Sequence, residues 1–364
     1  MASIPWWMTV LDETEADAVR SAVLARRISQ GPVSQQLADE IAETLGVKHA
    51  LCVPSGSMGL MLTMLALGIG PGDEVIVPDL TWIATAHGAS LLGANIILVD
   101  TLEDQPLMDP AKIENAITDK TKAIIPVHLA GRAVDMASVT QIAKKHNIPV
   151  IEDAAQALSS KGKDGYLGTI GDMGVFSLGL AKLIATGQGG VVVCKDDALF
   201  EKLKTCTFHG TDHIPAETYL MPGMNMKFPD TLASIGLIQW GRLQDKQEHV
   251  RRIYTTYQKG LRRHNHMVVQ PCDLDGGELP LWTEIRTPHR DNVKKFLASH
   301  NIESRLPHRP LHEARHLFSG NGESFPNAKQ LTDELLILPS GPNQPIGNVE
   351  KVIEILQQFD GTGE

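Results

Sequence analysis

Lys182 stands in an unusual setting for a lysine. It lies between an apolar run, residues 175–177, and a glycine-rich stretch, residues 186–190. Lysine side chains are normally exposed and solvated. The small and apolar neighbours here predict partial burial, which lowers the pKa of an amine and makes it a better nucleophile. For Lys182 viewed alone, a surface lysine beside a loop remains the simpler interpretation.

Asp153 closes another apolar run and is followed closely by Gln156. Ligands of open parallel sheets bind at the carboxyl ends of the strands. A carboxylate there could keep a ring nitrogen protonated, which is the condition under which pyridoxal phosphate (PLP) acts as an electron sink. Gln156 could donate a hydrogen bond to another ring substituent. A helix-capping Asp and a solvent-exposed Gln are the alternative.

The segment Ser55-Gly56-Ser57 precedes a helical pattern that starts near Met58. Small residues at a helix N-terminus let backbone N–H groups point outward, which makes a site for a phosphate. Ser177 could add a hydroxyl group. Because Ser-Gly-Ser also caps ordinary helices, capping alone is the competing interpretation.

The elements that must position these residues alternate in type. Apolar, β-branched runs predict strands, and helical spacing separates several of them, which is typical of βαβ units and a largely parallel, buried sheet. The predicted strands are 75–77, 96–99, 123–127, 150–151, 175–177 and 191–194, and the predicted helices are 12–26, 33–45 (closed by Gly46), 110–117, 135–146 and 230–262.

The pattern changes in the last third of the chain. After the long predicted helix the sequence indicates a smaller α+β unit with an irregular, His-rich loop at 305–316. We therefore expect a large domain, residues 1–245, which includes the N-terminal helices, and a small C-terminal domain, residues 246–364.

The composition favours a globular enzyme over a nucleic-acid binder. The 364 residues carry a net charge of −10, and 42% of them are hydrophobic, whereas nucleic-acid partners favour a basic face. Four scattered cysteines form no C-x-x-C pair, so we expect buried, reduced thiols and no metal site. No signal peptide and no apolar stretch of the ~18 residues needed for a membrane span is evident, which favours the cytoplasm.

Taken together, the clusters and the segments between them resemble the DegT/StrS family of PLP-dependent sugar aminotransferases, which have the fold-type I aminotransferase architecture. The resemblance runs nearly end to end. It is carried by segments in family order: "SQGPVSQQLADEIAETLGVKHALCVPSGS", "LGIGPGDEVIVPDLTWIATA", "AIIPVHLAGRAVDM", "IEDAAQALSS", "GDMGVFSLGLAKLIATGQGG" and "LHEARHLF".

This resemblance implies a role for each matching residue. Lys182 would hold PLP as a Schiff base and shuttle a proton, Asp153 would pair with the ring nitrogen, and Gln156 would lie near the ring oxygen. Trp82 would stack on the ring, although a half-buried core aromatic is a serious alternative. The phosphate would be held by Ser55, Gly56, Ser57 and Ser177, and by Asn225 from a neighbouring subunit, which implies a homodimer with shared active sites.

The substrates implied by the resemblance are glutamate and a nucleotide-linked keto sugar. Basic residues that could contact a diphosphate are Arg26, Arg27, Lys227, Arg305, His308 and Arg309, although surface charge is an alternative for each. The chain departs from the family at Ser57 (usually Thr), Leu178 (usually aromatic), Ala130 (often Tyr), Gln188 (often Glu) and Lys227 (commonly Arg or Tyr). These departures concern the substrate pocket more than the cofactor.

Three other functions remain open at this point. Related PLP enzymes transaminate amino-cyclitols or dehydrate sugars, but dehydratases of the family can carry His at the lysine position, so Lys182 favours transamination. A PLP-binding regulatory protein without turnover would keep the same residues. A doubly wound nucleotide-binding module would need a G-x-G-x-x-G turn after its first strand, and the sequence has none.

Overall fold

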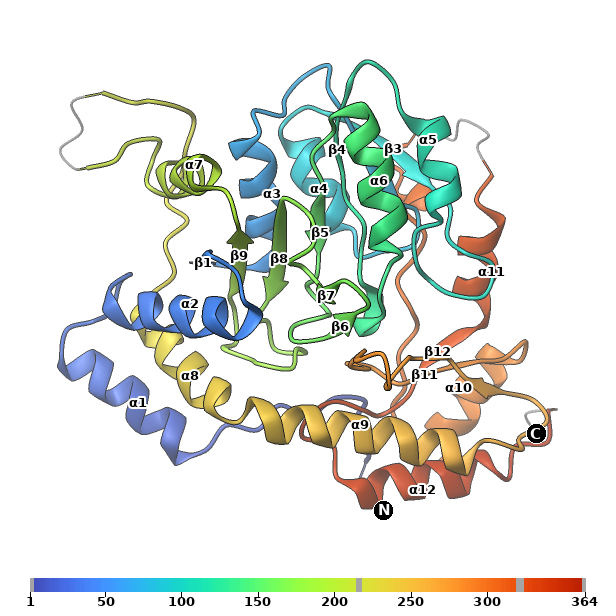
Figure 1. Cartoon of the computed structure of the whole chain (residues 1–364). Helices are drawn as coiled ribbons and strands as arrows, with labels where there is room; N and C mark the ends of the chain where they lie inside the picture. Colours follow the sequence, from blue (N-terminus) through green and yellow to red (C-terminus); the bar gives the residue numbers. More distant parts are fainter. Residues whose placement is uncertain (1–2, 214–217, 319–323, 362–364) are drawn as a thin grey trace.

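The computed structural model describes residues 3–213, 218–318 and 324–361, and its centre is a mostly parallel sheet (Figure 1). The strands lie in the order β1-β9-β8-β5-β4-β2-β3, where single parallel pairs, Ile124 with Val150 and Val127 with Asp153, join β5 to β4. β9 runs antiparallel to both of its neighbours. The strands are β1 (His49–Val53), β2 (Glu74–Pro78), β3 (Asn95–Val99), β4 (Thr121–Ile124), β5 (Ile151–Asp153), β8 (Met173–Ser177) and β9 (Gly190–Cys194).

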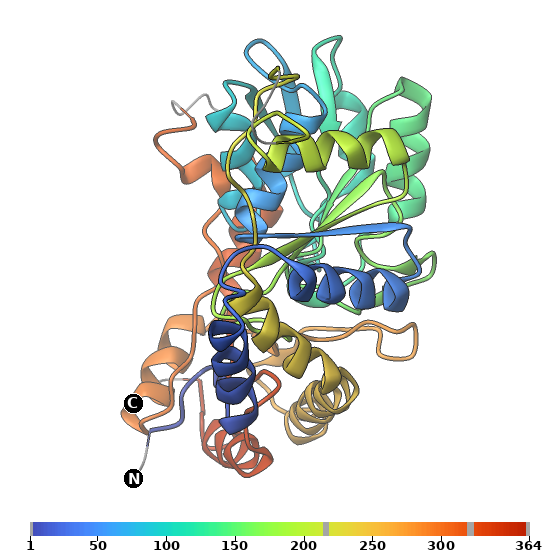
Figure 2. The ribbon, with the colours of Figure 1, turned by 90° about the vertical axis from the view of Figure 1, so that its left-hand side faces the viewer.

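Helices cover both faces of this sheet. Figure 2 shows α7 on one face and α2 on the other, which buries the apolar runs of the strands on both sides, as expected for a parallel sheet. The helices of this part are α1 (Glu13–Leu24), α2 (Pro32–Leu45), α3 (Gly56–Ala66), α4 (Ala84–Leu91), α5 (Ile113–Ala116), α6 (Met136–His146), α7 (Asp197–Thr207) and α8 (Asp230–Gly241). A short hairpin, β6 (Lys161–Gly162) and β7 (Gly165–Tyr166), lies beside them.

A second, antiparallel sheet forms the C-terminal part, in the order β10-β11-β12. Its hydrophobic cluster is built mainly from the last third of the chain but also includes Ile4. The elements are α9 (Leu243–Gly260), β10 (Val268–Val269), β11 (Glu284–Arg286), α10 (Arg290–Ser299), α11 (Pro326–Glu334), β12 (Leu335–Ile337) and α12 (Ile346–Leu356). The division into domains at residue 245 stays a prediction.

Several local predictions are confirmed. Asp12 caps α1 through a hydrogen bond from the Thr14 N–H to its side chain, and Gly46 ends α2 in the left-handed conformation (φ 66°) that glycine adopts without strain. Cys52, Cys194 and Cys206 are buried free thiols, as predicted, whereas the free Cys272 is only partly buried. Among the described residues, no helix is long and apolar enough to cross a membrane.

One predicted element is wrong. The continuous helix over residues 230–262 is two helices, α8 and α9, separated at Arg242, whose backbone (φ −103°, ψ 13°) leaves the helical region. The Arg242 guanidinium turns to Asp12 and to the buried Glu15 of α1, with N–O distances of 3.1 Å each. This tertiary contact accounts for a bend at a position that helical spacing alone cannot locate.

Candidate active site

Lys182 lies in the loop that joins β8 to β9, at the edge of the sheet where the parallel strands end. Ser177 pairs with Gly190 across the base of this loop. The Lys182 side chain is half-buried, and its Nζ atom lies 5.3 Å from the centre of a Trp282 ring. Burial lowers the pKa of Lys182 to about 8, Asp153 acts in the opposite direction, and the charge of Arg305 lowers the pKa further. Roughly a tenth of this amine is therefore unprotonated at pH 7, far more than for a lysine with its ordinary pKa of 10.5.

Asp153 is the last residue of β5 and is 5% exposed. The Thr85 hydroxyl donates to its Oδ2 atom at 2.7 Å, and the Ala155 N–H donates to its Oδ1 atom at 3.1 Å. Burial raises the pKa of Asp153, while both hydrogen bonds and the charge of Lys182 favour the ionised form. The carboxylate makes no ion pair with any described residue, so a cation can still approach it from the cavity.

The N-terminus of α3 lies at the same edge of the sheet. Ser55 caps the helix, because its Oγ atom accepts from the Met58 N–H at 3.1 Å. The structure gives the N–H groups of Gly56 and Ser57 no acceptor among the described residues, and such groups at a helix start attract anions. The packing requires a glycine here, since a Cβ atom on Gly56 would lie 3.1 Å from the Ser177 Cβ atom.

Gln156 connects the large sheet to the His-rich loop. Its Oε1 atom accepts from the Ala130 N–H at 2.7 Å, and its Nε2 atom lies 3.1 Å from Nε2 of His308. Burial, together with the charges of Lys182 and Arg305, lowers the pKa of His308 to about 4. The ring is therefore neutral at physiological pH and can accept the Gln156 amide hydrogen.

These groups surround one cavity of about 240 Å³. Ten of the residues predicted from the sequence line it: Ser55, Gly56, Ser57, Trp82, Asp153, Gln156, Ser177, Lys182, Arg305 and His308. Trp82 is 51% exposed at the rim, 5.4 Å from the His308 ring, so whether it stacks on a cofactor stays a prediction.

Five predicted residues lie outside this cavity. Arg26, Arg27 and Arg309 are exposed, and Arg309 forms an ion pair with Glu313. Asn225 is exposed and pairs with Phe208, whose ring lies 4.5 Å from the Lys227 ammonium group. The role of Asn225 in a neighbouring subunit stays a prediction.

The sequence interpretation missed Thr81, Thr85 and Trp282. The two threonine hydroxyls lie 3.0 Å apart and continue to Asp153. Thr81 lies before α4 and Thr85 is the second residue of that helix, so helical spacing in the motif "LTWIATA" did not signal their contact. Trp282 comes from the segment before β11, is 7% exposed, and its indole N–H has no partner among the described residues. No local pattern pointed to it.

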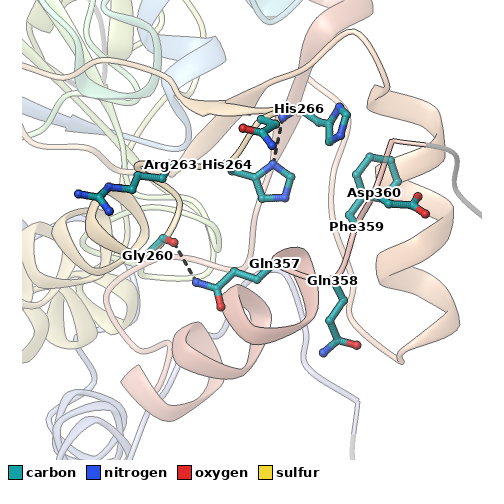
Figure 3. Close-up of a pocket in the computed structure, with 9 residues that line it drawn as sticks. Gly260, Arg263, His264, His266, Gln357, Gln358, Phe359 and Asp360 are labelled. Carbon is teal, nitrogen blue, oxygen red and sulfur yellow. Dashed lines mark hydrogen bonds between the residues drawn. The ribbon is translucent and has the colours of Figure 1, made fainter.

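A larger hollow of about 460 Å³ lies in the C-terminal part, between the ends of α9 and α12 (Figure 3). His264 accepts from the His266 N–H at Nδ1 and contacts the Leu356 carbonyl through Nε2, and Gln357 donates to the Gly260 carbonyl. These polar groups mainly hold the backbone. Within the described ranges, no three His, Cys, Asp or Glu side chains are placed to hold a metal ion. The cavity around Lys182 is therefore the better candidate.

Comparison with known proteins agrees with this geometry. The model of the DegT/DnrJ/EryC1/StrS aminotransferase family matches residues 9–357. The chain belongs to this family. It is 34% identical over 367 residues to the GDP-perosamine synthase of Caulobacter vibrioides, with 96% of each chain covered.

Solved structures agree in fold and in chemistry. DesV from S. venezuelae, solved in complex with a ketimine intermediate, is 29% identical with a TM-score of 0.89, covering 94% of this chain and 93% of DesV. Spr1654 from Streptococcus pneumoniae, solved in PLP and PMP forms, is 25% identical; its PLP form has a TM-score of 0.91 and 98% of each chain is covered. The chain is thus an aminotransferase that uses PLP, with the expected fold-type I architecture.

The residues present in the cavity fit PLP. The buried carboxylate, which has no ion-pair partner among the described residues, matches the ring nitrogen. The half-buried amine matches the aldehyde. The free N–H groups at the helix N-terminus match the phosphate. This fit is based on the chemical type and the burial of the groups that line the cavity. The role of each residue is proposed below.

Proposed function

We propose that this enzyme transfers the amino group of glutamate to a keto group of a nucleotide-linked deoxy sugar, at C3 or C4, and works in the cytoplasm as a homodimer. The observation that carries the proposal is that Lys182 and Asp153 line the same cavity. The pKa of the Lys182 amine is lowered, and the Asp153 carboxyl group is buried. The relationship to a GDP-perosamine synthase supports a nucleotide-linked sugar as acceptor.

Bound PLP supplies the electron sink that stabilises negative charge at the reacting carbon. Lys182 binds it and, when freed, moves the proton at the reacting carbon, because an amine with a pKa of about 8 both accepts and donates a proton near neutral pH. Asp153 keeps the ring nitrogen protonated, and the neutral His308 holds Gln156 in place. Arg305 places a positive charge at the mouth, where an anionic substrate enters.

Exposed apolar side chains near the cavity support the dimer. Trp82 and Leu180 are 51% and 60% exposed, and Tyr219, Leu220 and Met224, close to Asn225, are 74%, 60% and 50% exposed. A group of exposed apolar residues typically marks a protein interface. A two-fold dimer that buries them would allow Asn225 to reach the partner's cavity.

The transfer is tested in two half-reactions. Incubating the purified enzyme with glutamate should convert bound PLP to pyridoxamine phosphate, and a panel of nucleotide-linked 3-keto and 4-keto deoxy sugars should then regenerate PLP. Regeneration by a cyclitol ketone alone would instead identify an amino-cyclitol transaminase. Release of water from the sugar without amination would identify a dehydratase. Failure of glutamate and every other amino donor to react would favour a regulatory protein.

The shared site is tested by mixing subunits. Lys182→Ala and Asn225→Ala homodimers should each be weakly active, whereas a mixed dimer contains one cavity with both residues intact. Random exchange of equal amounts makes about half of the dimers mixed, each with one intact cavity, so recovery of up to about a quarter of the wild-type activity supports the shared site. If mixing recovers nothing although exchange of subunits is demonstrated, Asn225 does not act across the interface.

A further inference from the structure

Residues 4–9, here called the strap, lie along the C-terminal part of the molecule. Ile4 pairs in parallel with Ile302, and Trp7 pairs in parallel with Ser340. The Trp6 carbonyl accepts from the Ser340 N–H at 3.0 Å, and the Pro5 carbonyl accepts from the Gln344 side chain at 2.7 Å. The strap is thus fixed to the same part of the chain that carries Trp282 and Arg305.

From there the strap reaches the loop that contains Lys182. The indole N–H of Trp7 and the hydroxyl of Thr9 both donate to the Leu180 carbonyl, at 3.2 and 2.7 Å. The same indole N–H also donates to the Thr9 hydroxyl oxygen at 3.0 Å, so its hydrogen is shared between Thr9 and the Leu180 carbonyl. Leu180 precedes Lys182 by two positions, so both bonds hold the backbone directly before the reactive amine.

The backbone of this loop has few other restraints. We find no backbone hydrogen bond from residues 181–185 to any described residue; the nearest ones are at its base, between Leu178 and Gly189 and between Leu178 and Thr186. After Lys182, the side chain of Leu183 is buried in a cluster with Trp282, against which Trp6 and Trp7 pack. The strap therefore bonds the loop before Lys182 and packs against the hydrophobic cluster that buries Leu183 after it.

We propose that Trp7 and Thr9 are positioning residues for Lys182. Both bind the Leu180 carbonyl, and Trp7 also packs against the cluster that buries Leu183, which together hold Lys182 in the cavity. The proposal rests on the proposed role of Lys182 as the reactive amine. It requires no direct contact between the strap and a substrate. Without the two bonds, the loop can swing out, which would lower the population of the reactive geometry rather than the affinity for the substrate.

The strap also contacts two residues that surround the Lys182 amine, Arg305 and Trp282. The Arg305 guanidinium lies 4.7 Å from the centre of a Trp6 ring, and Trp6 packs edge-to-face on Trp282 at 6.3 Å. Because Arg305 and burial both lower the pKa of Lys182, a loosened strap that lets Lys182 reach water should raise that pKa.

The test compares Thr9→Val, which keeps the shape and removes the hydroxyl, with Trp7→Phe, which keeps an aromatic ring and removes the N–H. Thr9→Ser restores the donor. Thr44→Val is the matched control, because the Thr44 hydroxyl donates to a backbone carbonyl, that of Glu40, on an exposed helix face far from the cavity. The first measurement is hydrogen exchange in the cofactor-free protein, followed by mass spectrometry. It reports on the two bonded amides at the base of the loop, those of Leu178 and Thr186, which donate to the Gly189 and Leu178 carbonyls.

We expect exchange of the Leu178 and Thr186 amides to rise in Thr9→Val and Trp7→Phe and to stay unchanged in Thr9→Ser and Thr44→Val. In the cofactor-free protein, the pH midpoint for labelling of Lys182 by an amine-reactive reagent should move upward in the same two variants. Their kcat for the glutamate half-reaction should fall about fivefold per lost hydrogen bond, while KM for glutamate stays within about twofold.

The proposal fails if Thr9→Val and Trp7→Phe behave like the control Thr44→Val in loop exchange and in pH midpoint. It also fails if Thr9→Ser shows the same changes as Thr9→Val, since the serine restores the donor. If Trp7→Phe does not fold, the two Thr9 variants decide alone. Loop exchange and pH midpoint need no keto sugar, so they remain decisive even if the proposed sugar substrate is wrong.

Discussion

The Thr85 hydroxyl donates a 2.7 Å hydrogen bond to Oδ2 of Asp153, and Thr81 stands 3.0 Å behind it. Thr85 belongs to α4, whereas Asp153 ends β5. This bond is one of the few forces that favour the charged form of a carboxyl group whose pKa burial raises. A carboxylate held in this way can stay ionised inside the protein.

Thr85→Val should therefore raise the pKa of Asp153 and disfavour its ionised form. A hydrogen bond to a charged group contributes about 1.5–3 kcal/mol, so we expect kcat to fall about 10- to 100-fold. Thr85→Ser should keep most of the activity. Stopped-flow measurement of the glutamate half-reaction compares the variants, and a valine variant as fast as the wild type would show that the bond is dispensable.

Lys182→Ala should abolish covalent attachment of PLP and reduce the half-reaction by about 10²- to 10⁴-fold, the usual contribution of a proton-transferring group. Reduction with borohydride followed by peptide mass spectrometry locates the attached cofactor. Lys246→Met is the control, because burial also lowers the pKa of Lys246 to about 8, although Lys246 lies on α9 and outside the cavity. Cofactor found on Lys246 would contradict the assignment.

Arg305→Gln should shift the titration of Lys182. The Arg305 charge helps burial to lower the pKa of Lys182 to about 8 from its ordinary 10.5, so its removal should raise the pKa by roughly half a unit. Less amine is then unprotonated at pH 7.5. The readout is the pH dependence of Lys182 labelling by an amine-reactive reagent in the cofactor-free protein. Arg309→Gln, at an 88% exposed side chain, should leave this curve in place.

Glu152→Gln should destabilise the large domain by about 3 kcal/mol, because the amide cannot accept all the hydrogen bonds that the buried carboxylate accepts, and buried donors are left without a partner. Glu152 binds His128 at 2.8 Å and accepts from the N–H groups of Gly168, Ile170 and Gly171. Urea denaturation at neutral pH measures the loss. Glu114→Gln, which affects exposed pairs with Lys145 and His146, should change stability little.

The same variant should alter the pH dependence of stability. Burial opposes the charge of Glu152, but the bonds from His128 and the backbone outweigh it, so the folded pKa lies below the ordinary 4.5. A lowered pKa contributes stability above pH 4.5 that is lost as the pH falls through the folded value. Glu152→Gln should flatten the stability curve below about pH 4.5. If stability still falls as steeply with pH below about 4.5 in Glu152→Gln, other carboxyl groups cause that loss.

Residues whose setting is local could be predicted from the sequence. Lys182 and Asp153 follow or close short apolar strands, and the ends of parallel strands meet at one edge, so their placement in one cavity required no knowledge of distant contacts. Ser55 and Gly56 were found in the same way from their position before a helix.

Residues placed by packing could not be found in this way. Trp282 and the strap reach the cavity only because the C-terminal part folds back onto the loop of Lys182, and nothing near them in sequence signals it. The bend at Arg242 likewise depends on Glu15, over two hundred positions earlier. The position of Asn225 relative to another subunit is a property of an assembly, which one chain does not encode by local pattern.

The reversed direction of β9 has a consequence for how the site can change. Because β8 and β9 are antiparallel neighbours, the chain leaves and re-enters the sheet at the same edge. The intervening residues 178–189 form a short tether with both ends anchored beside the N-terminus of α3. A crossover to a parallel strand would instead carry the chain to the opposite edge. Lengthening this tether would misplace the amine while leaving the sheet intact, whereas added residues at the tip of the β6–β7 hairpin, away from the cavity lining, would leave the chemistry untouched.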